Sequence, residues 1–260
     1  MSTILDSIVA DTRLRVNFER TIRPINEVME GSRVRPRRTG FPFERALESE
    51  GMSLICEVKK ASPSKGVISE DFPYLDIARE CASAGASAIS VLTEPKYFRG
   101  DDRFLEEIAD SVDTPILRKD FVIDEYQIYR AREIGASAVL LIASILNDAQ
   151  LSDYRELAES LGMSALVETH TRDEVERAVS SGAGIIGVNN RDLSTFQVDI
   201  GNSLRLRDSI PDGIVCVSES GIAGAEDVRR LSEAGFDAVL VGEAFMRNPD
   251  RRSLMEAMRS

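Results

Sequence analysis

The sequence is poor in residues on which many binding sites depend. Its 260 residues contain no tryptophan, one histidine and three cysteines, and only five of its 32 basic residues are lysines. Cys56, Cys81 and Cys216 lack the spacing of a metal site, which predicts buried, reduced thiols in a cytosolic protein. His170 has no second histidine or cysteine at ligand spacing, so we expect no metal and interpret it as a loop residue before a helix.

Long hydrophobic runs and positive charge are also scarce. The longest apolar stretch, AVLLIASIL (138–146), is too short to span a bilayer. The N-terminal MSTILDSIVADTRLRV contains Asp6 and Asp11 and no continuous apolar core, so we do not expect a signal peptide. A net charge of −12 disfavours nucleic acid and anionic membranes as partners. We therefore expect a cytoplasmic protein in which any small anionic ligand needs a local basic site.

One unit recurs along the chain: a segment with helical periodicity, a glycine, and a short apolar run. Glycine at that position fits the left-handed C-cap of a helix. The apolar run fits a strand that is buried on both faces. The clearest copies are AGASAISVLT (84–93), IGASAVLLIAS (134–144), SGAGIIGVNN (181–190) and AGFDAVLVGEA (234–244).

Weaker copies raise the number of expected strands to eight, each with room for a helix after it. Alternating strands and helices predict a parallel sheet, and eight units favour a closed (β/α)8 barrel, the TIM-barrel architecture, over an open doubly wound sheet. We expect residues 1–50 to form a helical N-terminal extension and 51–260 the catalytic barrel, as a single domain overall. The expected strands are LICEVK (54–59), AISVLT (88–93), PILRKD (115–120), AVLLIA (138–143), SALVET (164–169), GIIGVN (184–189), IVCVSE (214–219) and AVLVGE (238–243).

Polar residues stand at the carboxyl ends of these strands, where barrels of this class carry their active sites. LICEVK places Glu57 and Lys59 on one face, because side chains alternate along a strand. The chain uses arginine in preference to lysine, so lysines at positions 59 and 119 indicate a need for a compact, titratable ammonium group. Charges gathered at one rim must be paired or used. The other strand-end residues are Glu168, Asn189, Arg191, Glu219 and Ser220.

A separate pattern indicates phosphate binding. The loops after the last two expected strands read SESGIAG and VGEAFM, where barrels often bind phosphate through glycine amides. Gly221 and Gly242 fit that role, although both also fit as plain turn glycines, and Ser62 could add a hydroxyl group. The arginine-rich RVRPRRTG, with four arginines within 33–38, is either a solvated loop or a rim element near an anionic ligand. These residues indicate an acid–base enzyme that acts on a small phosphorylated anion without a cofactor.

Six motifs, in barrel order, together resemble the indole-3-glycerol phosphate synthase family, and the resemblance covers essentially the whole chain. The resemblance implies closure of 1-(2-carboxyphenylamino)-1-deoxyribulose 5-phosphate to indole-3-glycerol phosphate, with loss of carbon dioxide and water and without metal or organic cofactor. The motifs are EVKKASPSKG (57–66), LTEPKYFRG (92–100), PILRKDF (115–121), LVETH (166–170), VNNRDL (188–193) and SESGI (218–222).

The resemblance also implies a role for each matching residue. Lys119 would be the general acid on the ribulose carbonyl, and Lys59 a cation near the substrate carboxylate with a part in dehydration. Glu57 would orient Lys59, and Glu168 would act as acid and base in dehydration and rearomatisation. The substrate hydroxyls would be bound by Asn189, Glu219 and Ser220. The aromatic ring of the substrate would pack against Phe98 and Phe121. The phosphate would be bound by Ser62, Arg191, Gly221 and Gly242.

One departure from the family pattern concerns Glu243, which stands where some members have a phosphate-binding serine. A carboxylate repels phosphate, so we expect either that backbone amides alone bind the phosphate or that Glu243 points away. The rival interpretations are another phosphate-handling barrel, such as phosphoribosylanthranilate isomerase or the tryptophan synthase α subunit, a Schiff-base aldolase, and a non-catalytic barrel that serves as a binding partner. The sequence leaves the oligomeric state open.

Overall fold

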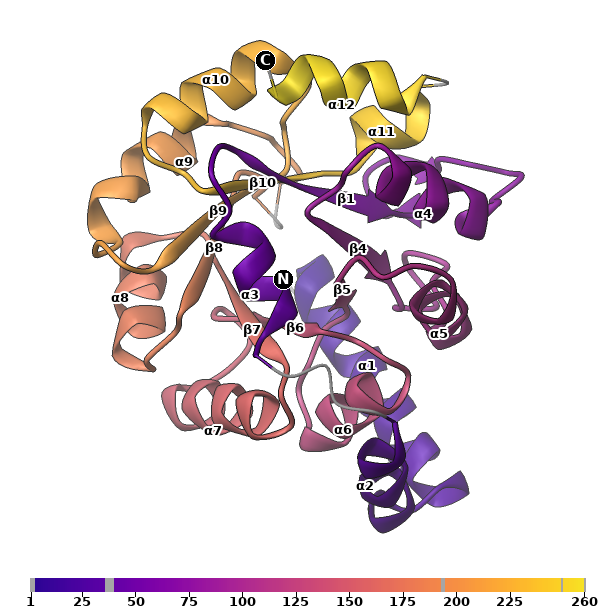
Figure 1. Ribbon diagram of the computed structural model, residues 1–260. Coiled ribbons are helices and arrows are strands. Elements are labelled where there is room, and N and C mark those ends of the chain that lie inside the picture. The colour runs from indigo at the N-terminus through magenta and orange to yellow at the C-terminus, as the bar shows by residue number, and fades with distance from the viewer. Residues whose placement is uncertain (1–2, 36–39, 193–194, 249, 260) are drawn as a thin grey trace.

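The structure is a computed structural model that describes residues 3–35, 40–192, 195–248 and 250–259. Eight parallel strands close into one barrel, with β1 paired to both β10 and β4 (Figure 1). Closure confirms the expected (β/α)8 architecture and excludes the open sheet. All eight expected strands are present. They are β1 (Ser53–Val58), β4 (Ala88–Leu92), β5 (Ile116–Lys119), β6 (Ala138–Ile142), β7 (Ser164–Thr169), β8 (Ile185–Asn189), β9 (Val215–Glu219) and β10 (Ala238–Val241).

Helices surround the barrel and alternate with its strands (Figure 1). Gly85, Gly135, Gly182 and Gly235 follow α4, α6, α8 and α10 with φ between +80° and +98°, as the expected C-cap role requires. The helices that follow the first strand are α4 (Tyr74–Ser83), α5 (Asp102–Ser111), α6 (Glu125–Glu133), α7 (Asp148–Ser160), α8 (Arg172–Ser180), α9 (Gly201–Leu206), the 3₁₀ turn η1 (Arg207–Ser209), α10 (Ala225–Glu233), α11 (Glu243–Arg247) and α12 (Arg251–Arg259).

The strands are buried on both faces. In β1, Leu54, Cys56 and Val58 belong to the core between the strands and the helices, whereas Ile55 belongs to the core inside the barrel. Glu57 shares the inward face with Ile55 and lies nearer the carboxyl end of the strand. The segment that begins with ASPSKG forms a small antiparallel hairpin of β2 (Ala61–Ser62) and β3 (Gly66–Val67).

The N-terminal extension packs against the barrel at both ends. It consists of α1 (Ile4–Ile22), α2 (Ile25–Val34) and α3 (Pro42–Leu47). Phe43 and Leu47 of α3 are fully buried against the inward-facing residues of the strands, and α3 lies across the centre of the barrel in Figure 1. At the other end, α1 contributes Ile8 to the same interior core. Both helices share a core with the barrel, which does not by itself mark a boundary. The division at residue 50 therefore stays a prediction.

The extension is also tied to the barrel by charge. Arg15 of α1 donates to both carboxylate oxygens of Asp120, each at 2.9 Å, and Asp120 directly follows the strand-end Lys119. Asp120 is buried, so this ion pair holds α1 over the loop that follows β5.

The described start of the arginine-rich run, at Arg35, lies at the opposite side of the barrel from its mouth. Residues 36–39 lie outside the described residues. Arg35 bonds Asp110 in the last turn of α5 at 2.5 Å, and its carbonyl oxygen accepts from Arg132 in the last turn of α6, at 2.8 Å. Helices of this fold end near the amino-terminal ends of the strands. The interpretation as a rim element is therefore wrong for Arg35.

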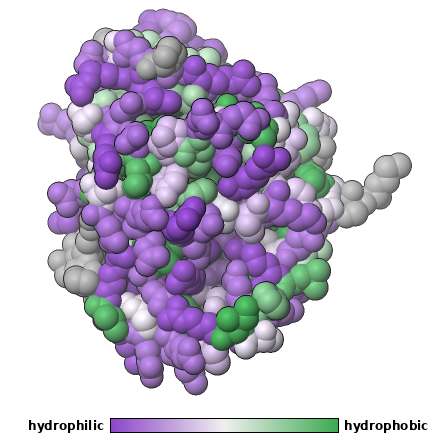
Figure 2. All heavy atoms as spheres, turned by 90° about the vertical axis from the view of Figure 1, so that its right-hand side faces the viewer, coloured by the Kyte–Doolittle hydropathy of each residue, from purple (hydrophilic) through white to green (hydrophobic). Residues whose placement is uncertain are grey.

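The surface and the thiols agree with the composition. The face in Figure 2 is mostly hydrophilic, as a net charge of −12 leads us to expect. Cys56, Cys81 and Cys216 are buried free thiols, as predicted. No helix in the described part of the chain is long and apolar enough to cross a membrane.

Candidate active site

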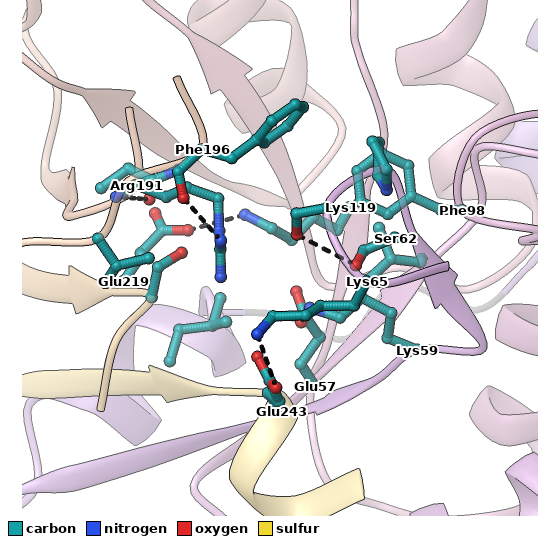
Figure 3. A pocket seen from close by; sticks show the side chains of 18 of the residues that line it. Glu57, Lys59, Ser62, Lys65, Phe98, Lys119, Arg191, Phe196, Glu219 and Glu243 are labelled. Carbon is teal, nitrogen blue, oxygen red and sulfur yellow. Dashed lines mark hydrogen bonds and ion pairs between the residues drawn. The ribbon is translucent and has the colours of Figure 1, made fainter. Parts of the chain in front are cut away.

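A cavity of about 760 Å³ opens at the carboxyl ends of the strands, and it brings together every residue that the sequence singled out for function (Figure 3). These residues come from seven of the eight strand ends or the loops that follow them, because the ends of parallel strands meet at one rim of a closed barrel. The thirteen are Glu57, Lys59, Ser62, Phe98, Lys119, Phe121, Glu168, Asn189, Arg191, Glu219, Ser220, Gly221 and Gly242.

Lys119 lies at the centre of a buried charge cluster. Its Nζ donates to Glu219 Oε2 at 2.7 Å and to Glu168 Oε2 at 3.2 Å. Burial by itself would lower the Lys119 pKa, but the negative charges of Glu219, Glu168 and Glu57 outweigh burial and raise it above its usual value. Lys119 is therefore an ammonium ion at neutral pH and holds a proton to donate.

The two carboxylates that share Lys119 have different pKa values. Burial is the main influence on Glu219 and raises its pKa to about 7, despite the opposing charge of Lys119. Burial acts the same way on Glu168, but Lys119, His170 and a hydrogen bond from Asn189 together lower the Glu168 pKa below its ordinary value. When two carboxyl groups have separated pKa values, the group with the lower pKa can act as a base while the other holds a proton.

A second ion pair joins Lys59 Nζ to Glu57 Oε2 on the first strand. Glu57 is 4% exposed, and its carboxylate packs against the backbone of Gly242 at the end of β10. A Cβ atom at Gly242 would lie 2.2 Å from Glu57 Oε2 and 3.1 Å from Lys59 Nζ. A side chain at this position would have to displace the ion pair, which is a reason for glycine beyond the expected phosphate contact.

We expect Gly242→Ala to lower turnover by up to about 10²-fold, because it displaces the Glu57–Lys59 pair while its own backbone, at φ −114°, accepts alanine without strain. Gly224→Ala is the matched control, since a Cβ atom there meets nothing within 4 Å. Steady-state kinetics and thermal unfolding of both variants check this. Equal kinetics for the two alanine variants would show that the close approach at Gly242 has no consequence.

The loops around the cluster are held in defined conformations. Asn189 Oδ1 accepts from the Arg191 backbone at 2.9 Å, and Ser220 adopts a left-handed φ of +66° immediately before Gly221, at +84°. Such conformations in a non-glycine residue store strain and are concentrated at functional sites.

Phe98 and Phe121 lie next to each other with ring centroids 6.1 Å apart, and together they form one apolar wall of the cavity.

Glu243 lines the cavity and is paired with two cations. Its Oε1 lies 3.5 Å from Lys65 Nζ and 3.2 Å from Arg247 Nε (Figure 3). The carboxylate therefore does not point away from the cavity, and two cations lie beside it. Phosphate binding by the backbone amides stays a prediction. Lys65 and Arg247 were not among the residues proposed from the sequence.

Other residues that shape the pocket were also not predicted from the sequence. Ile4, Leu5 and Ile8 of α1 line it, although no local pattern indicates where a terminal helix docks. Glu94 is buried and accepts from the backbone amides of residues 96, 97 and 98 at 2.6–3.0 Å, so it fixes the loop that carries Phe98. A charged residue directly after an apolar strand, in LTEP, was the available signal.

Within the described residues, no three His, Cys, Asp or Glu side chains are arranged to hold a metal ion. The fold and the cavity define a (β/α)8 barrel with buried lysine–glutamate clusters at its mouth. A family model described as indole-3-glycerol phosphate synthase matches residues 5–258. The chain belongs to the indole-3-glycerol phosphate synthase family, and it is a carboxy-lyase of tryptophan biosynthesis that carries out a decarboxylative ring closure.

Relatives of the same name are similar over nearly the full length. The indole-3-glycerol phosphate synthase of Lacticaseibacillus paracasei is 51% identical, and that of Ruminiclostridium cellulolyticum is 48% identical, each over 98% of both chains. Among solved structures, a 3-hexulose-6-phosphate synthase aligns with a TM-score of 0.66 and 14% identity, over 80% of this chain and 98% of that one. At that identity the likeness concerns the fold alone.

Proposed function

We propose that the buried cluster around Lys119 carries the ring closure of 1-(2-carboxyphenylamino)-1-deoxyribulose 5-phosphate. Lys119 donates its proton to the ribulose carbonyl oxygen, which makes the carbonyl carbon electrophilic enough for attack by the ring carbon. The single observation that supports this most is the pairing of Lys119 with two buried carboxylates, Glu219 and Glu168. Glu219 holds the ammonium group in place and also meets a substrate hydroxyl.

Lys59 takes the position near the substrate carboxylate, where its positive charge favours the departure of carbon dioxide and assists dehydration. Glu57 orients Lys59 through their ion pair. Glu168, with its lowered pKa, is anionic at neutral pH and can take up a proton during dehydration and rearomatisation. Asn189 and Ser220 bind substrate hydroxyls, and the pair Phe98 and Phe121 packs against the aromatic ring.

The phosphate group is assigned to the rim formed by the loops after β1, β8, β9 and β10. Ser62, Arg191, Gly221 and Gly242 all line that side of the cavity, and Lys65 and Arg247 add positive charge there. Gly221 has a φ of +84°, which favours glycine, and a Cβ atom there would lie 2.5 Å from Val198. A phosphate that replaces Glu243 as the partner of Lys65 gains a charge-assisted hydrogen bond.

A Schiff-base aldolase is the rival that the site argues against. A lysine that forms a Schiff base needs a lowered pKa so that its amine is neutral, whereas the Lys119 pKa is raised by its carboxylate neighbours. We also propose the cytoplasm as the place of action, because three buried free thiols suit a reducing compartment, and neither nucleic acid nor membrane as partner, because the chain is strongly acidic.

Two assays test the proposal on the untagged protein. We expect the purified chain to convert the carboxyphenylamino-deoxyribulose phosphate to a fluorescent indole product in the absence of added metal or cofactor. Borohydride added during turnover should leave the protein mass unchanged. A mass increase equal to the reduced substrate adduct would replace acid catalysis by Schiff-base chemistry, and an absence of indole fluorescence would reject the assignment of substrate.

A further inference from the structure

His170, the only histidine of the chain, is unused by the proposed steps and yet lies against the active-site cluster. It follows β7 directly, and its side chain is 16% exposed. Its Nδ1 lies 3.5 Å from Glu174 Oε2 of α8, and its Nε2 lies 3.8 Å from Glu168 Oε1. Nε2 is buried and has no hydrogen-bond partner among the described residues. The imidazole thus lies between two carboxylates.

The backbone of His170 is fixed on both sides, which makes its position a defined part of the fold. Its N–H donates to Glu174 Oε2 at 2.7 Å, and its carbonyl oxygen accepts from the Asn202 side chain of α9 at 3.1 Å. The point from which the side chain extends toward Glu168 is therefore fixed.

Glu168 lies between Lys119 and His170. Glu57, Glu168 and Glu219 are each at most 4% exposed. Among the described residues, Lys59 pairs with Glu57, whereas the single ammonium group of Lys119 pairs with both Glu168 and Glu219. Burying a carboxylate without a full partner is costly. Glu168 uses Oε2 for Lys119 and turns Oε1 toward His170, so an imidazolium there adds positive charge at the oxygen that Lys119 does not contact.

We propose that His170 is a positioning residue that acts through Glu168, holding one carboxylate oxygen while Lys119 holds the other. When Lys119 turns to the substrate and donates its proton, His170 keeps Glu168 anionic and oriented for the later proton transfer. The inference rests on the acid–base role proposed above for Glu168, but the contact between the two side chains can be tested without it.

The charged groups that face His170 set the direction of its titration. They are Glu168 from β7, Glu174 from α8 and, at longer range, Glu219 from β9; Asn202 of α9 is neutral. Burial lowers the His170 pKa, but these carboxylates outweigh burial and raise it above its ordinary value of 6.5. The stabilising charge is therefore complete below pH 6.5 and is lost as the pH rises through the raised pKa.

Nuclear magnetic resonance can follow this titration without assignment, because the untagged chain has a single imidazole. We expect a midpoint above 6.5 in the wild-type protein and a midpoint about one unit lower in Glu168→Gln, since the neutral amide no longer favours the imidazolium. Glu226→Gln, the same change at a carboxylate that is 69% exposed on α10, should leave the midpoint unchanged. A midpoint that Glu168→Gln does not move would overturn the proposal.

The pH dependence of turnover supplies the second readout. His170 lowers the pKa of Glu168, so in His170→Gln the acid limb of the turnover profile should move about one unit to higher pH. A merely structural role would lower turnover by the same factor at every pH, and that outcome also overturns the proposal. If the wild-type protein had no activity on the proposed substrate, the proposed function would be wrong. The imidazole titration would still test the contact between His170 and Glu168.

Discussion

Lys119→Ala is expected to lower turnover by about 10²–10⁴-fold with little change in KM, which corresponds to about 3–5 kcal/mol of lost transition-state stabilisation. The variant removes the proton donor of the first step and leaves the aromatic wall and the phosphate rim in place. Steady-state measurement of indole fluorescence gives both constants. Because an interaction made only in the transition state is removed, the loss should fall on kcat and on kcat/KM equally.

The variant should still fold. Without the ammonium group, Glu168 and Glu219 form a buried pair of like charges, and one of them takes up a proton to relieve the repulsion. The Glu219 pKa of about 7 is already close to neutral, which makes this carboxyl the first to protonate. Circular dichroism and thermal unfolding should therefore resemble those of the wild-type protein.

Lys119→Arg is the matched comparison, since it retains the positive charge between the same two carboxylates. A guanidinium group is planar and bulkier than the compact ammonium group, so it can pair with Glu168 but cannot place a proton where Lys119 Nζ does. We expect turnover as low as in Lys119→Ala. Wild-type turnover in the arginine variant would show that a fixed charge is sufficient and that Lys119 is not the acid. Near-normal turnover in the alanine variant would remove Lys119 from the mechanism.

The strand-end residues could be predicted because two simple regularities place them. Alternation along β1 sets Glu57 and Lys59 on one face, and the closed parallel sheet brings the ends of distant strands such as β5 and β7 to one rim. Closure makes β1 and β10 neighbours, so the loops after them must meet, and the contact of Lys65 with Glu243 follows from that adjacency.

Other parts of the site have no local cause in the sequence. Whether α1 lies over the mouth of the barrel depends on long-range ion pairs, such as Arg15 with Asp120 and Lys96 with Asp11, and on the burial of Ile8. The base is closed by α3, which the pattern predicted only as part of a helical extension. Gly187, in the middle of β8, is a similar case. A Cβ atom there would lie 2.2 Å from Glu219 Oε1, so the space for that carboxylate is made on the neighbouring strand.

Glu168→Gln should separate the early steps of the reaction from the late ones. Lys119 still protonates the carbonyl in this variant, so ring closure and decarboxylation can proceed, whereas the amide cannot accept the proton that leaves during dehydration and rearomatisation. We expect indole formation to slow by about 10²–10⁴-fold. In a single turnover, carbon dioxide should therefore appear well before the indole fluorescence.

The order in which the products appear distinguishes the Glu168→Gln variant from the Lys119→Ala variant. Loss of the acid at Lys119 delays carbon dioxide and indole together, because both follow the first step. Loss of the base at Glu168 delays only the indole, and Glu226→Gln, at a surface carboxylate on α10, should delay neither. If carbon dioxide and indole rose together in Glu168→Gln, the carboxylate would act before decarboxylation. Its place between Lys119 and His170 would then serve the ring closure itself.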